Sequence, residues 1–198
     1  MASRDSRSPE TPPQELNRLE LLQALAAILR GDAEVGGLAC FREEDGLRSL
    51  AWVASEQLVS PALYPALVRN GQLDFVRPDF RAYLQSLYEL NVRRNERLVA
   101  QAHELWDALA ARDIGPIALK GLAGLVGELY PQPGERLMQD IDLLVVESRL
   151  PVARAALVAL GYRPTPAPGA TEADYDRTQQ QAPLIHPARY LMRGVGLS

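Results

Sequence analysis

Two aspartates, Asp140 and Asp142, carry the clearest chemical signal in the chain, because a single residue separates them. They lie in the apolar run 138–146, which predicts a central strand of a sheet. Alternate side chains of a strand point to one face, so both carboxylates are expected to project together. Two such charges repel each other unless a cation lies between them. Hard oxygen ligands suit Mg²⁺ or Mn²⁺, which often bind together with substrate phosphates.

A lysine precedes a glycine turn earlier in the chain. Lys120 is the only lysine among 21 basic residues, and Gly121 follows it. The apolar segment 114–119 predicts a short buried strand before this turn, and residues 122–130 predict a short helix after it. The free N–H groups and positive dipole end of a helix start suit an anion, and a lysine ammonium is a good point charge for phosphate. Chance retention of one lysine is the alternative.

The aspartates also have a purely structural interpretation. Arg136 follows the proline- and glycine-marked loop 131–135 and precedes the strand that carries them. Asp140 and Asp142 would then lie at an exposed strand end and pair with arginines such as Arg136. The sequence alone leaves both interpretations open.

Helical periodicity dominates the chain before these motifs. Apolar residues recur at the spacing of amphipathic helices in three regions, 14–30, 41–70 and 78–112. Ser60 and Pro61 divide the middle region into two helices, because proline fits the first turn of a helix. We therefore expect a helical domain at residues 14–112, after a disordered tail at 1–13 that has no apolar periodicity.

The pattern changes at Asp113. From there on, short apolar segments alternate with short helices, including one at 150–160 that Gly161 ends. Residues 113–198 are therefore expected to form a second domain, a small core with a short mixed β-sheet flanked by helices. The fold class predicted for the whole chain is α+β.

Composition excludes several classes of protein. The chain has 198 residues, 47% of them hydrophobic and 23% charged, which is ordinary for a globular protein. The formal net charge of -4 gives no strong signal for nucleic-acid binding. Cys40 is the only cysteine, so there is no disulfide framework and no cysteine-based zinc site. No apolar run is long enough for a membrane span, and the start lacks the core of a signal peptide, so the expected location is the cytoplasm.

Three motifs together resemble a known family. They are L-K-G at 119–121, L-Y-P-Q-P-G-E-R-L-M-Q-D-I-D-L-L-V-V at 129–146 and L-G-Y at 160–162. The sequence resembles the uncharacterised bacterial nucleotidyltransferases of the DNA polymerase β-like superfamily. A helical stretch at 52–67 is also similar to the region before the catalytic core of that family. A lone D-x-D is a weak signal, whereas its combination with L-K-G and Arg136 is specific.

The resemblance implies a reaction and a set of site residues. Asp140 and Asp142 would bind the divalent ions, Mg²⁺ or Mn²⁺, that bridge the triphosphate of a nucleoside triphosphate. Gly121 and the following helix start would cradle phosphates, while Lys120 and Arg136 would neutralise developing charge. An acceptor hydroxyl of unknown identity would attack the α-phosphate and release pyrophosphate, so the partners are the nucleotide and that acceptor.

The family also implies a third carboxylate from a later strand. No acid after residue 146 matches that pattern, and the strand would begin where the sequence ends, at Gly194–Ser198. We therefore expect residues 113–198 to be a C-terminally truncated core with doubtful activity. The exposed sheet edge of such a core could pair with another copy of the chain.

Two other functions remain open at this point. The chain could be a catalytically inactive member that kept the scaffold as a binding or interaction module. It could also be a sugar-nucleotide glycosyltransferase, since these enzymes use a metal-binding D-x-D. That fold needs a longer nucleotide-binding α/β half before the motif, and the helical front half argues against it.

Overall fold

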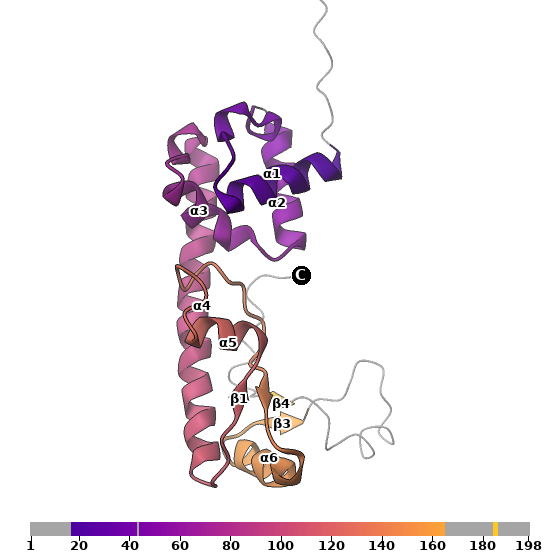
Figure 1. Ribbon diagram of the computed structural model, residues 1–198, viewed down its shortest axis with the longest axis vertical. Coiled ribbons are helices and arrows are strands. Elements are labelled where there is room, and N and C mark those ends of the chain that lie inside the picture. Colours follow the sequence, from indigo (N-terminus) through magenta and orange to yellow (C-terminus); the bar gives the residue numbers. More distant parts are fainter. Residues whose placement is uncertain (1–16, 43, 165–183, 186–198) are drawn as a thin grey trace, which may run out of the picture. The chain divides into compact units, whose positions relative to one another are not determined.

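The computed structural model describes residues 17–42, 44–164 and 184–185 and divides the chain into two compact units, residues 1–89 and 90–198 (Figure 1). The described residues are mostly helical, with short strands in antiparallel pairs, whereas the predicted fold class was α+β with a mixed sheet. The long helix α4 (Pro78–Ala110) contributes its beginning to the first unit and the rest to the second. The predicted tail at 1–13 lies outside the described residues, and the domain boundary at Asp113 stays a prediction.

The first unit contains α1 (Arg18–Arg30), α2 (Glu44–Glu56), α3 (Ser60–Arg69) and the start of α4. Three short 3-10 helices connect them: η1 (Val35–Gly37), η2 (Ala39–Phe41) and η3 (Leu73–Phe75). The predicted helices 14–30, 41–70 and 78–112 are confirmed here, with small shifts at their ends. Their shared core consists of buried aliphatic side chains from all four helices: Leu21, Leu25, Ile28, Leu50, Leu63, Leu67 and Leu84.

Local signals set the helix ends of this unit. Asn17 caps α1: its Oδ1 accepts from the Glu20 N–H, and the Glu20 carboxylate accepts from the Asn17 N–H, both at 3.0 Å. Gly31 ends α1 in the left-handed region with φ 88°. Pro61 lies in the first turn of α3, as its fixed φ favours.

The second unit contains the rest of α4, α5 (Lys120–Val126), η4 (Glu147–Arg149) and α6 (Leu150–Ala159). Its strands form two antiparallel pairs. β1 (Ile117–Ala118) pairs with β2 (Leu143–Leu144), with Ile117 opposite Leu144 and Ala118 opposite Leu143. β3 (Arg163–Pro164) pairs with β4 (Leu184–Ile185).

The predicted mixed sheet is not found among the described residues. The predicted strands 114–119 and 138–146 each shorten to two residues, β1 and β2. Pro116 has no N–H for a ladder, and only one face of the pair is buried: Leu143 packs in the core while Leu144 is 52% exposed. An apolar run alone cannot reveal how many neighbouring strands it has.

Two small clusters form the core of the second unit. Leu109 and Ile114 pack with Ala153 and Ala156 of α6, and Leu143 lies against this cluster. A second cluster joins α4, α5 and the segment before β2 through Ala102, Leu122 and Met138. Both clusters include side chains from the C-terminal part of α4. This helix therefore packs against the segments that carry the predicted site residues. In the described residues, no helix is apolar over a length sufficient to span a bilayer.

Candidate functional site

The fold brings Lys120 and Asp142 into direct contact. The Lys120 Nζ atom lies 3.0 Å from the Asp142 Oδ2 atom, with the lysine side chain 70% exposed and the aspartate side chain 29% exposed. Lys120 is the first residue of α5, separated from β1 by Leu119, and Asp142 directly precedes β2. The Leu119 N–H donates to the Asp142 carbonyl at 3.0 Å, which extends the β1–β2 pairing by one residue. Backbone pairing therefore places the two side chains together.

Asp140 lies close enough to act on the same lysine. The pKa of Lys120 is raised, first by its hydrogen bond to Asp142, then by the charge of Asp142, with a smaller contribution from the charge of Asp140. Both aspartates precede β2 instead of lying within a strand, which corrects the predicted strand 138–146. Strand geometry therefore does not align the carboxylates, and of the two it is Asp142 that contacts the Lys120 ammonium.

The backbone of Lys120 is unusual. Its φ of 49° lies in the left-handed region, which residues with a Cβ atom rarely adopt. Strained backbone of this kind persists only where the surrounding contacts hold it, and such residues gather at functional sites. The Asp142 contact and the β1–α5 junction hold Lys120 in place here.

Gly121 is packed against the segment that leads to the aspartates. A Cβ atom at this position would lie 2.7 Å from Cγ of Met138 and 3.7 Å from Nε of Arg136. Glycine is thus required for the close approach of α5 to buried Met138, whatever else it contacts. The same approach puts the exposed Arg136 side chain beside the residue that follows Lys120.

Two asparagines that the sequence interpretation did not consider contact the loop before Met138. Asn91 and Asn95 are the buried polar residues of the described chain, at 3% and 1% exposure, and both donate to loop carbonyls. They lie on the α4 stripe that continues as Leu98 and Ala102. Asparagine at positions where the helical period calls for an apolar residue is the signal that could have revealed them.

A divalent ion such as Mg²⁺ needs several oxygen ligands. Asp140 and Asp142 supply hard oxygens, and the Asp142 side chain, 29% exposed, already has a cationic neighbour in the Lys120 ammonium. Within the described residues, no group of three histidine, cysteine, aspartate or glutamate side chains could hold a metal ion. Asp140 and Asp142 would supply two carboxylate ligands to one such ion, and water and phosphate would have to supply the others.

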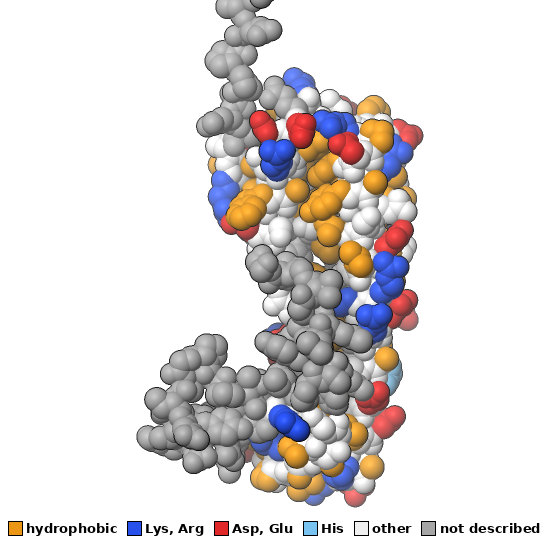
Figure 2. Space-filling view, turned by 180° about the vertical axis from the view of Figure 1, so that it is seen from behind, with side chains coloured by type: hydrophobic (Ala, Val, Ile, Leu, Met, Phe, Trp, Pro, Cys, Tyr) orange, Lys and Arg blue, Asp and Glu red, His pale blue; other side chains and the backbone are white. Residues whose placement is uncertain are grey.

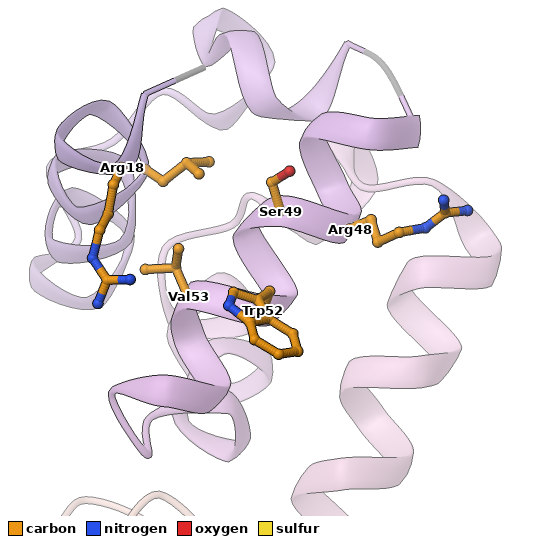
Figure 3. A pocket seen from close by; sticks show the side chains of 6 residues that line it. Arg18, Arg48, Ser49, Trp52 and Val53 are labelled. Carbon is orange, nitrogen blue, oxygen red and sulfur yellow. The ribbon is translucent and has the colours of Figure 1, made fainter. Parts of the chain in front are cut away.

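A separate pocket lies in the first unit. Its volume is about 420 Å³, and its lining comprises Arg18, Leu21, Arg48, Ser49, Trp52 and Val53 (Figure 3). Trp52 is 68% exposed, and apolar side chains interrupt the charged surface of this unit in the space-filling view (Figure 2). Arg18 pairs with Glu56 at 2.7 Å, and Arg48 pairs with Glu44 at 3.3 Å. None of the predicted site residues lines this pocket.

Comparison with known families agrees with the motifs. The family described as uncharacterised nucleotidyltransferase matches residues 43–192, which is most of the chain. The protein belongs to this nucleotidyltransferase family, and the resemblance predicted from the sequence is confirmed. The match includes all five predicted site residues, Lys120, Gly121, Arg136, Asp140 and Asp142. Neither a curated protein nor a solved structure is significantly similar to the chain.

Proposed function

We propose that this protein binds a nucleoside triphosphate with a divalent ion and transfers its nucleoside monophosphate to an acceptor hydroxyl. The observation that carries the proposal is the contact of Lys120 with Asp142 beside Arg136, in a member of a nucleotidyltransferase family. A lysine, an arginine and two carboxylates supply charges of both signs, as a metal–triphosphate ligand requires. Family membership favours this function over a sugar-nucleotide glycosyltransferase.

Each residue has a distinct proposed role. Asp140 and Asp142 hold one Mg²⁺ or Mn²⁺ ion, which when bound neutralises phosphate charge and orients the triphosphate. Lys120 and Arg136 bind phosphate oxygens, the lysine as a point charge and the arginine through its planar set of donors. Gly121 keeps α5 against Met138, so that its backbone and the Arg136 side chain lie together.

The proposed reaction is a displacement at phosphorus. The oxygen of the acceptor hydroxyl forms a bond to the α-phosphorus, the bond from that phosphorus to the bridging oxygen of the β-phosphate breaks, and pyrophosphate leaves. The hydroxyl proton passes to solvent. Catalysis comes mainly from holding the triphosphate and from compensating the charge on its oxygens.

A titration tests the binding part of this proposal. Isothermal titration calorimetry with Mg²⁺ and each nucleoside triphosphate should show metal-dependent binding by the natural protein. The double variant Asp140→Asn/Asp142→Asn should lose it. A matched control, Glu96→Gln/Asp107→Asn, removes two exposed charges of α4 and should bind as the natural protein does. Equal binding by the natural protein and the aspartate variant would refute the site.

A non-catalytic member of the family is the second candidate. It is favoured by the finding that the aspartate pair gains no third ligand of its kind within the described residues. The two candidates differ in pyrophosphate release with a mixed pool of hydroxyl acceptors and all four nucleotides. Metal-dependent binding without release would favour the binding module, while release that Asp140→Asn/Asp142→Asn abolishes would favour the enzyme.

A further inference from the structure

We propose that Asn91 and Asn95 are positioning residues that fix the loop at 133–136 and thereby the guanidinium of Arg136. The role of Arg136 in binding phosphate rests on the proposed function. The contact of Asn91 and Asn95 with the loop backbone, which we call the clamp, rests on the hydrogen bonds alone. The two asparagines touch neither the aspartate pair nor Lys120 through any hydrogen bond in the described chain. They therefore act on the site through the loop.

The hydrogen bonds converge on three carbonyls of this loop. Asn91 Nδ2 donates to the carbonyl oxygens of Gly134 at 2.8 Å and Arg136 at 2.9 Å. Asn95 Nδ2 donates to those of Pro133 at 2.6 Å and Arg136 at 2.8 Å. The Arg136 carbonyl accepts from both asparagines, so its backbone is held from two successive turns of α4.

Position on the helix explains why two residues can share one carbonyl. Asn91 and Asn95 are four residues apart, so they lie one above the other on one face of α4. Leu98 and Ala102 continue that face into the core cluster with Leu122 and Met138. The face is apolar where it meets α5 and polar only where it meets the loop.

The chemistry of this contact demands an amide. Three backbone carbonyls point at the helix and need N–H donors, and each asparagine nitrogen offers two. Leucine would fill a similar volume but would leave the buried carbonyls without donors, and aspartate would present oxygen to oxygen. The Oδ1 atoms of both asparagines are buried without a hydrogen-bond partner in the described structure. An apolar side chain at either position would avoid the cost of burying an oxygen without a hydrogen-bond partner. The presence of two amides therefore indicates that the loop carbonyls require their N–H donors.

The loop transmits this position to the site. Arg136 lies two residues before buried Met138. The Cγ atom of Met138 limits how closely α5 can approach this segment at Gly121. Asp140 follows two residues after Met138. Holding the Arg136 backbone thus fixes the origin of its side chain beside Gly121.

A double-variant cycle tests the proposal by binding. Asn91→Leu and Asn95→Leu should each weaken metal-dependent nucleotide binding about tenfold, as should Arg136→Ala. Asn95→Leu/Arg136→Ala should bind no worse than Arg136→Ala alone, because the asparagine acts through the arginine. Losses that multiply in the double variant would overturn the proposal. Asn91→Ser and Asn95→Ser, which keep one hydroxyl donor, replace the leucine variants if those fail to fold.

A matched control separates positioning from general stability. Asn70 also donates its side-chain Nδ2 to a backbone carbonyl, that of Ile28 at 3.0 Å, but it belongs to the first unit. Asn70→Leu should lower the melting temperature without changing nucleotide affinity. An equal loss of affinity in Asn70→Leu and Asn95→Leu would show a mere stability effect and overturn the proposal.

Hydrogen exchange supplies a readout that needs no nucleotide. Peptides that cover residues 131–140 should exchange about tenfold faster or more in Asn91→Leu and Asn95→Leu, and should be unchanged in Asn70→Leu. If the natural protein binds no nucleotide, the proposed function fails. The exchange rates of these peptides then test by themselves whether the asparagines hold the loop. Unchanged exchange in the asparagine variants would refute the clamp.

Discussion

The ammonium of Lys120 lies 3.0 Å from Oδ2 of Asp142, so the carboxylate proposed to bind a divalent ion already has a cationic neighbour. The sequence motifs predict that the lysine is a phosphate ligand and that the aspartate is a metal ligand. The structure places the two side chains in contact, so an ion that binds Oδ2 of Asp142 would have to displace the lysine ammonium. Binding of metal and phosphate would therefore compete with this ion pair and free the ammonium for phosphate.

Lys120→Met should separate the two roles. Without the ammonium, Asp142 and Asp140 are less neutralised, so Mn²⁺ alone should bind several-fold more tightly. The nucleotide should bind several-fold more weakly if the lysine is the proposed phosphate ligand. Electron paramagnetic resonance of free Mn²⁺ measures the first effect, and calorimetry measures the second. Lys120→Arg is the control that keeps the charge, and a parallel weakening of both affinities in Lys120→Met would contradict the competition.

The ion pair should persist to high pH. The pKa of Lys120 is raised above its ordinary 10.5, chiefly by the hydrogen bond to Asp142. A raised lysine pKa adds stability that is fully present below the ordinary value and is lost as the pH rises through the folded value. The difference in melting temperature between the natural protein and Lys120→Met should be small, since the pair is exposed, and constant from about pH 6 to about pH 9. A difference that vanishes within that range would disagree with the raised pKa.

Gly121→Ala should destabilise the second unit. The added Cβ atom would lie 2.7 Å from Cγ of Met138, and relief requires a shift of this buried side chain. We expect a loss of about 1–3 kcal/mol in the free energy of unfolding, as for other overpacked sites. Gly115→Ala is the matched control, because nothing lies within 4 Å of its new atom.

Urea denaturation measures both glycine variants. In the background Met138→Ala, the Gly121→Ala substitution should cost less than in the natural protein, because the clashing atoms are gone. An equal cost in both backgrounds would show that Met138 is not the cause.

Cys40 should be unreactive until the first unit unfolds. The side chain is 2% exposed, and burial raises the pKa of its thiol to about 11 from the ordinary 9.0. The thiolate is the reactive form, so a disulfide reagent at neutral pH should label Cys40 only in denaturant. The raised pKa also predicts a loss of stability as the pH rises from 9.0 to about 11, since only the unfolded thiol ionises readily there. Fast labelling in native buffer would contradict the burial.

The sequence by itself determined most of the helices and the family, although the helix predicted at 122–130 lies at Lys120–Val126 as α5. The capping residues Asn17 and Glu20, Pro61 in the first turn of α3, and the apolar period of α4 are local signals, because a helix makes its hydrogen bonds within one turn of the chain. The motif that contains Lys120 and the aspartates indicated a nucleotidyltransferase, and the family match confirms it. The residues that act in this motif stay a prediction.

Only the tertiary structure decided what these residues contact. Strand pairing joins distant segments, so the apolar runs could not show that β1 and β2 would pair over two residues each or that Lys120 would lie on Asp142. The asparagines of α4 gave no recognised motif, because their partners are backbone carbonyls that any sequence provides. Contacts between segments depend on which surfaces the fold brings together, and that information is not present in any single stretch of the chain.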